Sequence, residues 1–292
     1  MPIEMPGRED NYVMDTKSGA EMARLIDQHQ FFTEHMGGLF PLEVDPSTIH
    51  DVLDLACGPG GWVQDVAFEH MDIDVTGVDI SKAMVDYART MARVQGLDNA
   101  HFEVMDIRQH LDFFDDTFDF VNIQFLSLAL SPAEWPGLVA ECKRILKPGG
   151  ILRLTEADDG GITNSPALEH LADLSVTTFR KFGRTFFHSG RFSGTMSMIG
   201  QLLRKAGFQD IHQEAHVIDW SSGTKAHNAQ FHNMRALMAL GREFMLGTKA
   251  IIPEEYDALC EQAELEMYSE DFCATLIYLS ALGKADKPNL VE

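Results

Sequence analysis

The sequence predicts an α/β protein with a mostly parallel sheet and helices on both of its faces, and three observations support this. Short apolar runs alternate with segments of helical spacing between residues 45 and 160, which is typical of a parallel sheet. The first run, Val52–Ala56, breaks at Gly58–Gly61 and is followed at once by helical spacing. The second apolar run ends on an acid, Asp79, about 20 residues further on. Ligands of such sheets bind beyond the C-terminal strand ends, where these residues fall.

The glycine-rich turn predicts a nucleoside ligand, and two kinds remain open. Glycines let a ligand approach the backbone, and the helix start offers free N–H groups. A dinucleotide fingerprint has the frame G-x-G-x-x-G, which here carries Ala56, Gly58 and Gly61, so NAD is compatible with the turn. Asp54, inside the preceding strand, instead favours a ligand with an ammonium or sulfonium charge. The alternative is that Asp54 only accepts hydrogen bonds from the turn.

Four motifs together resemble those of the class I S-adenosylmethionine-dependent methyltransferases of the small-molecule type. In chain order they read VLDLACGPGG, VTGVDIS, FEVMDI and LKPGGILRLTE, and they span Asp51–Glu156. The resemblance implies a Rossmann-like fold with a seven-stranded, mostly parallel sheet and helical cap insertions. It also implies S-adenosyl-L-methionine as the cofactor. Ala56 departs from the family, which usually has glycine there, and its methyl group is expected to displace the cofactor slightly.

The resemblance assigns roles to residues at the strand ends. It implies that Gly58 and Gly60 approach the methionine part of the cofactor. Asp79 would accept the two ribose hydroxyls, and Asp106 with Ile107 would hold the adenine. The cofactor-binding candidates are Tyr12, Gln28, Asp54, Ala56, Gly58, Gly60, Asp79, Ile80, Asp106, Ile107 and Gln124.

Composition narrows the range of partners. The chain of 292 residues has a formal net charge of −22, which argues against nucleic acid because its phosphates would be repelled. No apolar run reaches the roughly 18 residues that a membrane span needs, and the N-terminus lacks a signal-peptide pattern. The four cysteines lack metal-site spacing, which predicts a reduced, cytoplasmic protein without a metal. The expected partner is a small-molecule acceptor, and the sequence is compatible with a homo-oligomer.

The apolar periodicities and turn residues predict the order of the elements. Strands are predicted at residues 51–56, 73–80, 101–105, 118–125, 151–156, 207–220 and 275–282, the last antiparallel if the family topology holds. Helices are predicted at 19–36, from Ser81 through Met91, from a capping box at Ser131 to Ile145, from Ser165, and over 231–245 and 253–270. We expect one domain, 1–292, with an N-terminal cap (1–40), a cofactor-binding core (45–160) and substrate-side insertions (161–206 and 221–272).

The N-terminal segment is expected to fold over the cofactor. Residues 1–17 are predicted to form a flexible arm, and the helix that follows carries His29 on its apolar stripe. That position suits a buried histidine with satisfied ring nitrogens as well as a cofactor contact. In methyltransferases with such a helix the element often caps the cofactor. This resemblance makes Tyr12, Gln28 and His29 candidates.

One basic and aromatic stretch stands out in this acidic chain. Ser175–Phe192 contains Arg180, Lys181, Arg184 and Arg191, five phenylalanines and no acid. We predict that Phe179–Phe192 lines the acceptor pocket, because the family inserts substrate-binding elements at this point. At least one side chain from the set Arg180, Arg184, His188 and Arg191 would then face the substrate. The alternative is that the arginines pair with surface carboxylates.

These observations predict methyl transfer to a small, largely apolar molecule such as a specialised metabolite. Glu156 and His188 are the candidate catalytic residues, although Glu156 could instead pair with Arg153 or cap the next turn. The Asn-Pro-Pro-Tyr type of motif used on amino groups of bases is absent after the fourth strand, and Asp158–Asp159 leaves a metal-dependent catechol site open. The rival prediction is a cofactor-binding protein with a non-methylating, cyclase-like or binding role.

Overall fold

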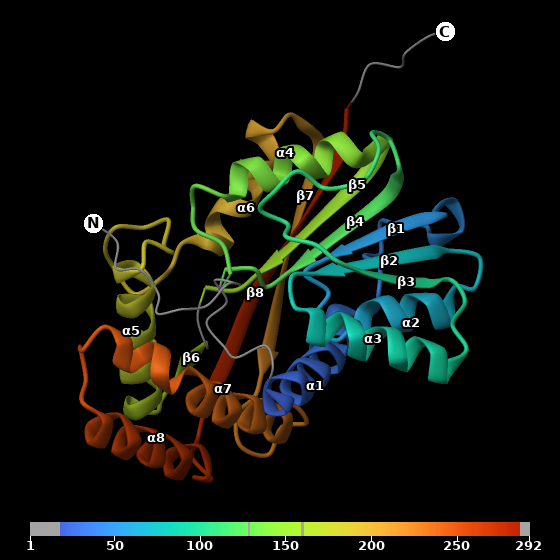
Figure 1. The fold of residues 1–292 in the computed structure, drawn as a ribbon. Helices are drawn as coiled ribbons and strands as arrows, with labels where there is room; N and C mark the ends of the chain where they lie inside the picture. Colours follow the sequence, from blue (N-terminus) through green and yellow to red (C-terminus); the bar gives the residue numbers. More distant parts are fainter. Residues whose placement is uncertain (1–17, 128, 159–160, 287–292) are drawn as a thin grey trace, which may run out of the picture.

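The computed structural model describes residues 18–127, 129–158 and 161–286, and one mixed sheet runs through it (Figure 1). Its strands are β1 (Asp51–Leu55), β2 (Asp74–Asp79), β3 (Ala100–Val104), β4 (Phe118–Gln124), β5 (Leu146–Glu156), β6 (Ile162–Thr163), β7 (Phe208–Asp219) and β8 (Ala274–Ala285). They lie in the order β3-β2-β1-β4-β5-β8-β6, and β7 pairs with β8. The strands from β1 to β5 are parallel, and β8 is antiparallel to β5, β6 and β7, as predicted for the last strand.

The strand order reverses between β1 and β4, which lie side by side in the centre of the sheet. β1 pairs with β2 on one edge and with β4 on the other. Because the loops that follow β1 and β4 diverge at such a switch point, they leave a crevice beyond the C-terminal strand ends. The sequence places the glycine turn after β1 and Phe125–Leu126 after β4 at this crevice.

Helices cover both faces of the sheet (Figure 1). The covering helices are α2 (Gly61–Glu69) and α3 (Lys82–Gln95) on one face, and α4 (Trp135–Ile145) and α6 (Thr195–Lys205) on the other. Neighbouring strand residues point to opposite cores, so Val52 packs with α2 and α3 whereas Leu53 packs with α4 and α6. Burial on both faces explains why the strands read as nearly continuous apolar runs.

A third group of helices packs away from the sheet faces, at the lower left and bottom of Figure 1. It consists of α1 (Gly19–Met36), α5 (Pro166–Lys181), α7 (His227–Gly247) and α8 (Pro253–Met267). Side chains of these helices form a separate apolar core with β8, in which Trp220, Tyr256 and Tyr278 are almost fully buried. Members of this core come from both stretches predicted to be substrate-side insertions, 161–206 and 221–272.

The structure corrects several predicted boundaries. The helix expected from Ser131 begins at Trp135. The residues before it form a separate turn, in which Ser131 N and Oγ both donate to Glu134 Oε2 at 2.7 Å. The short strand β6 was not predicted, so the sheet has eight strands instead of seven. α6, which falls within the insertion predicted at 161–206, packs on the sheet against β5, β7 and β8.

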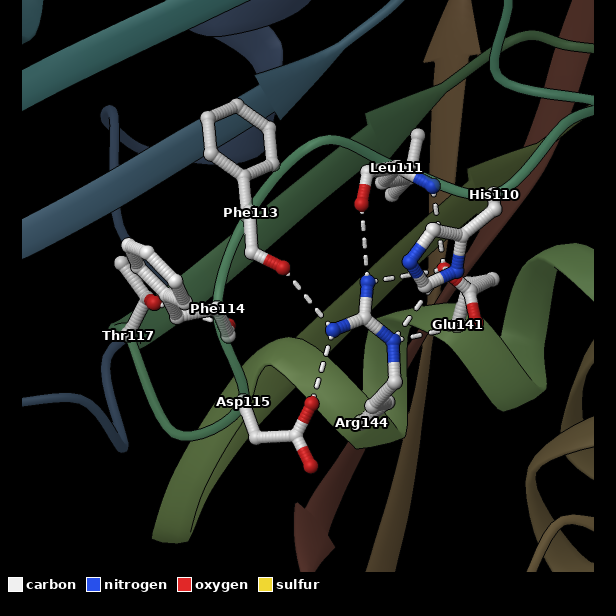
Figure 2. A network of polar contacts seen from close by, with 8 residues as sticks. All are labelled: His110, Leu111, Phe113, Phe114, Asp115, Thr117, Glu141 and Arg144. Carbon is white, nitrogen blue, oxygen red and sulfur yellow. Dashed lines mark hydrogen bonds and ion pairs between the residues drawn. The ribbon is translucent and has the colours of Figure 1, made fainter.

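The loop between β3 and β4 is held against α4 by Arg144, as Figure 2 shows. Arg144 donates to the Leu111 carbonyl oxygen at 2.9 Å and forms an ion pair with Glu141 at 2.9 Å. Glu141 in turn accepts a hydrogen bond from Leu111 N at 3.0 Å. Because Asp106 and Ile107 begin this loop, the network helps to fix one wall of the crevice.

Candidate functional site

A cavity of about 420 Å³ lies at the C-terminal ends of β1, β2 and β4 and extends beneath α5 and α7. Its size is that of a small-molecule or cofactor site. The predicted cofactor-binding residues that line it are Gln28, Asp54, Ala56, Gly58, Asp79, Ile80, Asp106, Ile107 and Gln124. Tyr12 lies outside the described residues. The cavity therefore brings together side chains that the sequence places up to about a hundred residues apart.

Asp79 ties the glycine turn to the end of β2. Its Oδ2 accepts a hydrogen bond from Gly58 N at 2.9 Å, and its Oδ1 accepts one from Ser81 N at 2.7 Å. Asp79 also lines the cavity. Asp79 thus positions the turn and presents a negative charge to a ligand.

Gly60, which was predicted to approach the cofactor, packs against β3 and α3 and does not line the cavity. Its φ is +79°, and a Cβ there would lie 2.5 Å from Phe102 Cε1 and 2.9 Å from Ala88 Cβ. The position requires glycine because of packing on β3 and α3. Gly58, with φ of +54°, does line the cavity.

Two non-glycine residues with left-handed backbone geometry border the cavity. Ala56 follows β1 with φ of +59°, and Phe125 follows β4 with φ of +56°. This conformation costs an L-residue about 1–2 kcal/mol. Strain of this kind concentrates at functional sites, where the surrounding structure must maintain it. Ala56 therefore adds backbone strain as well as a methyl group where the family usually has glycine.

Asp54 belongs to a buried polar row that crosses three neighbouring strands. It is paired in register with Asn122 of β4, which is paired with Arg153 of β5. Asn122 Nδ2 donates to Asp54 Oδ1 at 2.7 Å, and Arg153 Nε donates to Asn122 Oδ1 at 2.7 Å. Burial raises the pKa of Asp54 to about 7, although the Asn122 hydrogen bond and the Arg153 charge act in the opposite direction. Asp54 is therefore poised to gain from a cationic ligand.

Asp106 forms a two-pronged ion pair with a neighbouring arginine. Its two carboxylate oxygens accept hydrogen bonds from Arg108 Nε and Nη2, each at 2.8 Å. Hydrogen bonding to the Arg108 side chain lowers the pKa of Asp106, which stays charged. Ile107 and Ile80 add apolar surface on the same side of the cavity, suited to a flat aromatic ring.

α1 covers the glycine turn, as the predicted cap should. Leu25 Cδ1 lies 3.6 Å from the position of a Cβ on Gly58, and His29 lies directly above Gly61. His29 Nε2 pairs with Asp65 of α2 at 2.7 Å, and its Nδ1 lies 3.3 Å from the Thr33 hydroxyl. The ring nitrogens of His29 thus have partners, as expected of a satisfied histidine, and its side chain also lines the cavity.

The rest of the cavity forms an apolar chamber. It is lined by Phe125, Leu126, Leu168, Leu171, Ala172, Val176, Phe179, Met234, Leu237, Met238, Phe244, Met245 and Leu276. These side chains come from the loop after β4, from α5, from α7 and from β8. Arg191, Glu169 and Asp173 also line the cavity, and Arg191 pairs with Asp173 at 3.2 Å and with Glu169 at 3.4 Å. These exposed charges place a polar rim on an apolar interior.

The basic and aromatic stretch contributes less to the cavity than predicted. All of Phe179–Phe192 is described, and within it Phe179 and Arg191 line the cavity whereas Arg180, Arg184 and His188 do not. The stretch after α5 instead folds on itself, since Phe186 N and Phe187 N both donate to Ser193 O. Arg191 also pairs with the surface carboxylates of Glu169 and Asp173, which was the alternative interpretation of its charge.

Neither predicted catalytic residue lines the cavity. Glu156 is fully buried behind its wall and accepts hydrogen bonds from Leu126 N at 2.6 Å and Ser127 N at 3.4 Å. It therefore caps the turn after β4 and does not pair with Arg153. Burial raises the pKa of Glu156 to about 8, despite these hydrogen bonds. His188 is exposed on the outer loop.

Comparisons with known proteins identify the family. Residues 52–150 match the model of a methyltransferase domain. The demethylmenaquinone methyltransferase of Lactiplantibacillus plantarum is 30% identical over 176 residues, which are 55% of this chain and 71% of that protein. The chain is a class I S-adenosylmethionine-dependent methyltransferase. Its cofactor is S-adenosyl-L-methionine, and the predicted family, fold and cofactor are confirmed.

Two further comparisons cover a smaller share of the related protein. Phosphoethanolamine N-methyltransferase 3 of Arabidopsis thaliana is 30% identical over 164 residues, which are 56% of this chain but only 29% of that protein. The Haemonchus contortus phosphoethanolamine N-methyltransferase 2, solved with S-adenosyl-L-methionine, superposes with a TM-score of 0.54 at 17% identity, covering 93% of this chain and 57% of that one. This second likeness concerns the fold alone.

The residues at the strand ends of this methyltransferase fit its cofactor. Asp54 and Asp79 are buried carboxylates that line the cavity and could pair with an ammonium group or accept from hydroxyls, and Ile80 and Ile107 add apolar surface that an adenine ring could pack on. Gln124 Nε2 is buried beside them without a hydrogen-bond partner among the described residues, so a donor is left over for a ligand. No helix in the described ranges is both long and apolar enough to cross a membrane.

Two residues of the buried polar row were not among the predicted site residues. Asn122 and Arg153 interrupt apolar strands, in FVNIQF and ILRLTE. A polar side chain inside a doubly buried strand needs a partner, and that signal is visible in the sequence. What the sequence does not show is that the two residues and Asp54 share one row of the sheet.

Proposed function

We propose that this methyltransferase transfers a methyl group from S-adenosylmethionine to a small, largely apolar acceptor, such as a specialised metabolite, held in the chamber under α5 and α7. The observation that carries the proposal is the lining of the chamber, where leucine, methionine and phenylalanine side chains surround the space beside the strand ends. Met-rich walls adapt to irregular apolar shapes. Polar groups lie at the cofactor end, at the rim and between α1 and α7, where Arg24 donates to Asn233 Oδ1 at 3.2 Å.

The names of the relatives point to different acceptors. Demethylmenaquinone is an apolar quinone-type molecule, whereas phosphoethanolamine is a small charged amine. The chamber of this chain favours the apolar type, because burying an unpaired charge among such side chains would be unfavourable by several kcal/mol or more. At its rim Arg191 forms exposed ion pairs with Glu169 and Asp173, and on the α1 side the buried cation Arg24, which lines the cavity, is paired with Glu21 at 2.7 Å.

Each part of the cavity has a role in this proposal. Asp79 accepts hydrogen bonds from the ribose hydroxyls, Asp54 faces the ammonium group, and Ile107 packs on the adenine. The cofactor supplies an electrophilic methyl group on a sulfonium sulfur. The protein holds the acceptor about 3–3.5 Å from that methyl group and excludes water, which can supply much of the rate enhancement. Glu156 contributes indirectly, because it fixes the Leu126–Ser127 backbone between the cofactor end of the cavity and the acceptor chamber.

The proposal is tested by label transfer. The full chain is incubated with S-adenosylmethionine tritiated on its methyl group and with a panel of acceptors, and the products are partitioned between ethyl acetate and water. The panel contains apolar phenols, enols and amines on one side and phosphoethanolamine and glycine derivatives on the other. We expect label in the organic phase with at least one apolar acceptor. Label only in the charged compounds would contradict the acceptor class, and an inert protein that still binds cofactor would favour a non-methylating role.

Arg191 provides a prediction for the rim of the chamber. Because it lines the cavity on an exposed loop, Arg191→Ala should lower methylation of acceptors with an anionic end by about three- to tenfold, the loss of one charge-assisted contact. The dissociation constant for S-adenosylhomocysteine should not change. His188→Ala is the matched control, since His188 is exposed on the same loop but does not line the cavity. Equal turnover of both variants and the unmodified chain would show that Arg191 only forms surface ion pairs, which contribute about 0–1 kcal/mol.

A further inference from the structure

Arg153 is an unusual residue for the centre of a sheet. It lies on β5, is 2% exposed and has the face of Trp62 at 5.3 Å and that of Phe120 at 5.6 Å. Its Nη1 donates to the Leu39 carbonyl oxygen at 2.8 Å, and its Nη2 has no hydrogen-bond partner among the described residues. Burying a cation is unfavourable unless a negative charge compensates it.

The compensating charge is Asp54, although the two side chains do not touch. Burial lowers the pKa of Arg153 to about 10, and the charge of Asp54 opposes this shift. Asn122 bridges the pair, since its carbonyl oxygen accepts from Arg153 and its amide donates to Asp54. Because an amide passes polarisation between its two ends, the row behaves as one buried ion pair with an inserted link.

Asp54 is the end of the row that lines the cavity, whereas Asn122 and Arg153 lie behind it. The other charged or titratable groups around Asp54 are Asp79 and Cys57 on the cofactor side, and Arg24 and His29 of α1, which line the same cavity. On the far side of the row, Arg153 lies around a small second pocket with His212, Glu214 and His216 of β7. Burial and, to a smaller extent, the charge of Arg153 lower the pKa of His216. Asp79 acts against ionisation of Asp54, so the charge of Arg153 is needed to offset both burial and the second carboxylate.

We infer that Arg153, acting through Asn122, is a positioning residue that keeps Asp54 ionised and aimed at the ammonium group of the cofactor. This inference rests on the proposed placement of that group at Asp54. It assigns no contact between Arg153 and the cofactor. A cationic ligand at Asp54 would extend the row to a series of alternating charges, with Arg153 at one end, Asp54 in the middle and the ligand's ammonium group at the other end.

The test compares two probes that differ in the amino-acid part. S-adenosylhomocysteine carries the ammonium group, and its deaminated analogue, 5′-S-(3-carboxypropyl)-5′-thioadenosine, has the same nucleoside and carboxylate without it. Calorimetry on the full chain at pH 6, 7 and 8 gives both affinities, and their ratio isolates the contact made by the ammonium group. In the unmodified chain the ratio should rise with pH and level off above pH 7, because the ionised fraction of Asp54 limits binding.

The variant Arg153→Met should lower this ratio about tenfold at pH 7 and move its rise to higher pH, since the pKa of Asp54 increases when the cation is removed. Arg153→Lys should retain most of the ratio, and Asn122→Leu should lower it as Arg153→Met does. Lys143→Met is the matched control, because Lys143 also donates to backbone carbonyls and lies over an aromatic ring, but away from the cavity.

The outcomes separate the inference from the proposed function. If neither probe binds the unmodified chain, the proposed cofactor site is wrong. If both bind but the ratio is independent of pH in the unmodified chain, or is as high in Arg153→Met and Asn122→Leu as in Lys143→Met, the inference is overturned while the site stands. The pH dependence of the ratio in the unmodified chain needs no variant, so misfolding of the variants cannot remove the test.

Discussion

Replacing Asp79 with alanine is expected to weaken S-adenosylhomocysteine binding by about 10- to 100-fold. The change removes the charged acceptor proposed for the ribose hydroxyls, and hydrogen bonds to charged groups contribute about 1.5–3 kcal/mol. It also leaves Gly58 N and Ser81 N without their acceptor, so the glycine turn loses its link to β2. Calorimetric titration of the variant measures the loss directly.

Asp106→Ala should weaken binding by less than about tenfold, and the contrast between the two acids is the informative part. The carboxylate of Asp106 is occupied by Arg108, and Ile107 would still pack on the adenine. Asp86→Ala on α3 is the control, because Asp86 is exposed and pairs with Lys82. Equal affinities for Asp79→Ala and the unmodified chain would show that the assignment of the strand ends is wrong.

Filling the acceptor chamber should have the second large effect. Ala172 lies on the face of α5 that lines the cavity, between Leu168 and Val176. Ala172→Trp would place an indole ring in the acceptor space and is expected to lower methyl transfer by about 100-fold or more, since a displacement of about 1 Å can already have that effect. Binding of S-adenosylhomocysteine should change less than about threefold, because the nucleoside end is untouched.

The control for this variant is His170→Trp, which adds the same ring on the exposed side of the same helix. Tritium transfer to the best acceptor of the panel and calorimetry with S-adenosylhomocysteine give the two quantities. Normal turnover of Ala172→Trp would place the acceptor elsewhere. A parallel loss of cofactor binding would mean that the chamber is not separate from the cofactor end.

The sequence alone was sufficient to predict the parallel core, because the signals for its strands and turns are local. The residues of β1, β2 and β4 are buried on both faces, so their apolar runs are continuous, and glycine, serine or proline marks the turns between them. The helix predicted at 19–36 ends where Gly37 adopts φ of +81°, a position that glycine tolerates without strain. Local signals of this kind do not depend on the rest of the fold.

The chamber could not be predicted to the same degree, because it depends on how distant helices pack. Arg191 and His188 lie three residues apart in one basic stretch, yet the first lines the cavity and the second is exposed outside it. Glu156 shows the same limit. Its place at the end of β5 suggested a catalytic acid, but the two backbone amides that occupy it come from the loop after β4.

The polar row illustrates an intermediate case. The residues Asp54, Asn122 and Arg153 are each recognisable as polar side chains within apolar strands. Their alignment depends on the strand order and register, which place β1, β4 and β5 side by side. Once the order is known, the sequence spacing is enough to find the row.

A crystal structure of the methyltransferase with S-adenosylhomocysteine bound tests the central claim most directly, namely that one cavity holds the cofactor at the strand ends and the acceptor beside it. The ribose should lie against Asp79 and the amino-acid part against Asp54, with the sulfur open to the chamber next to Phe125 and Met234. A sulfur atom that faces bulk solvent, or one that is closed off from the chamber by the protein wall, would contradict the account.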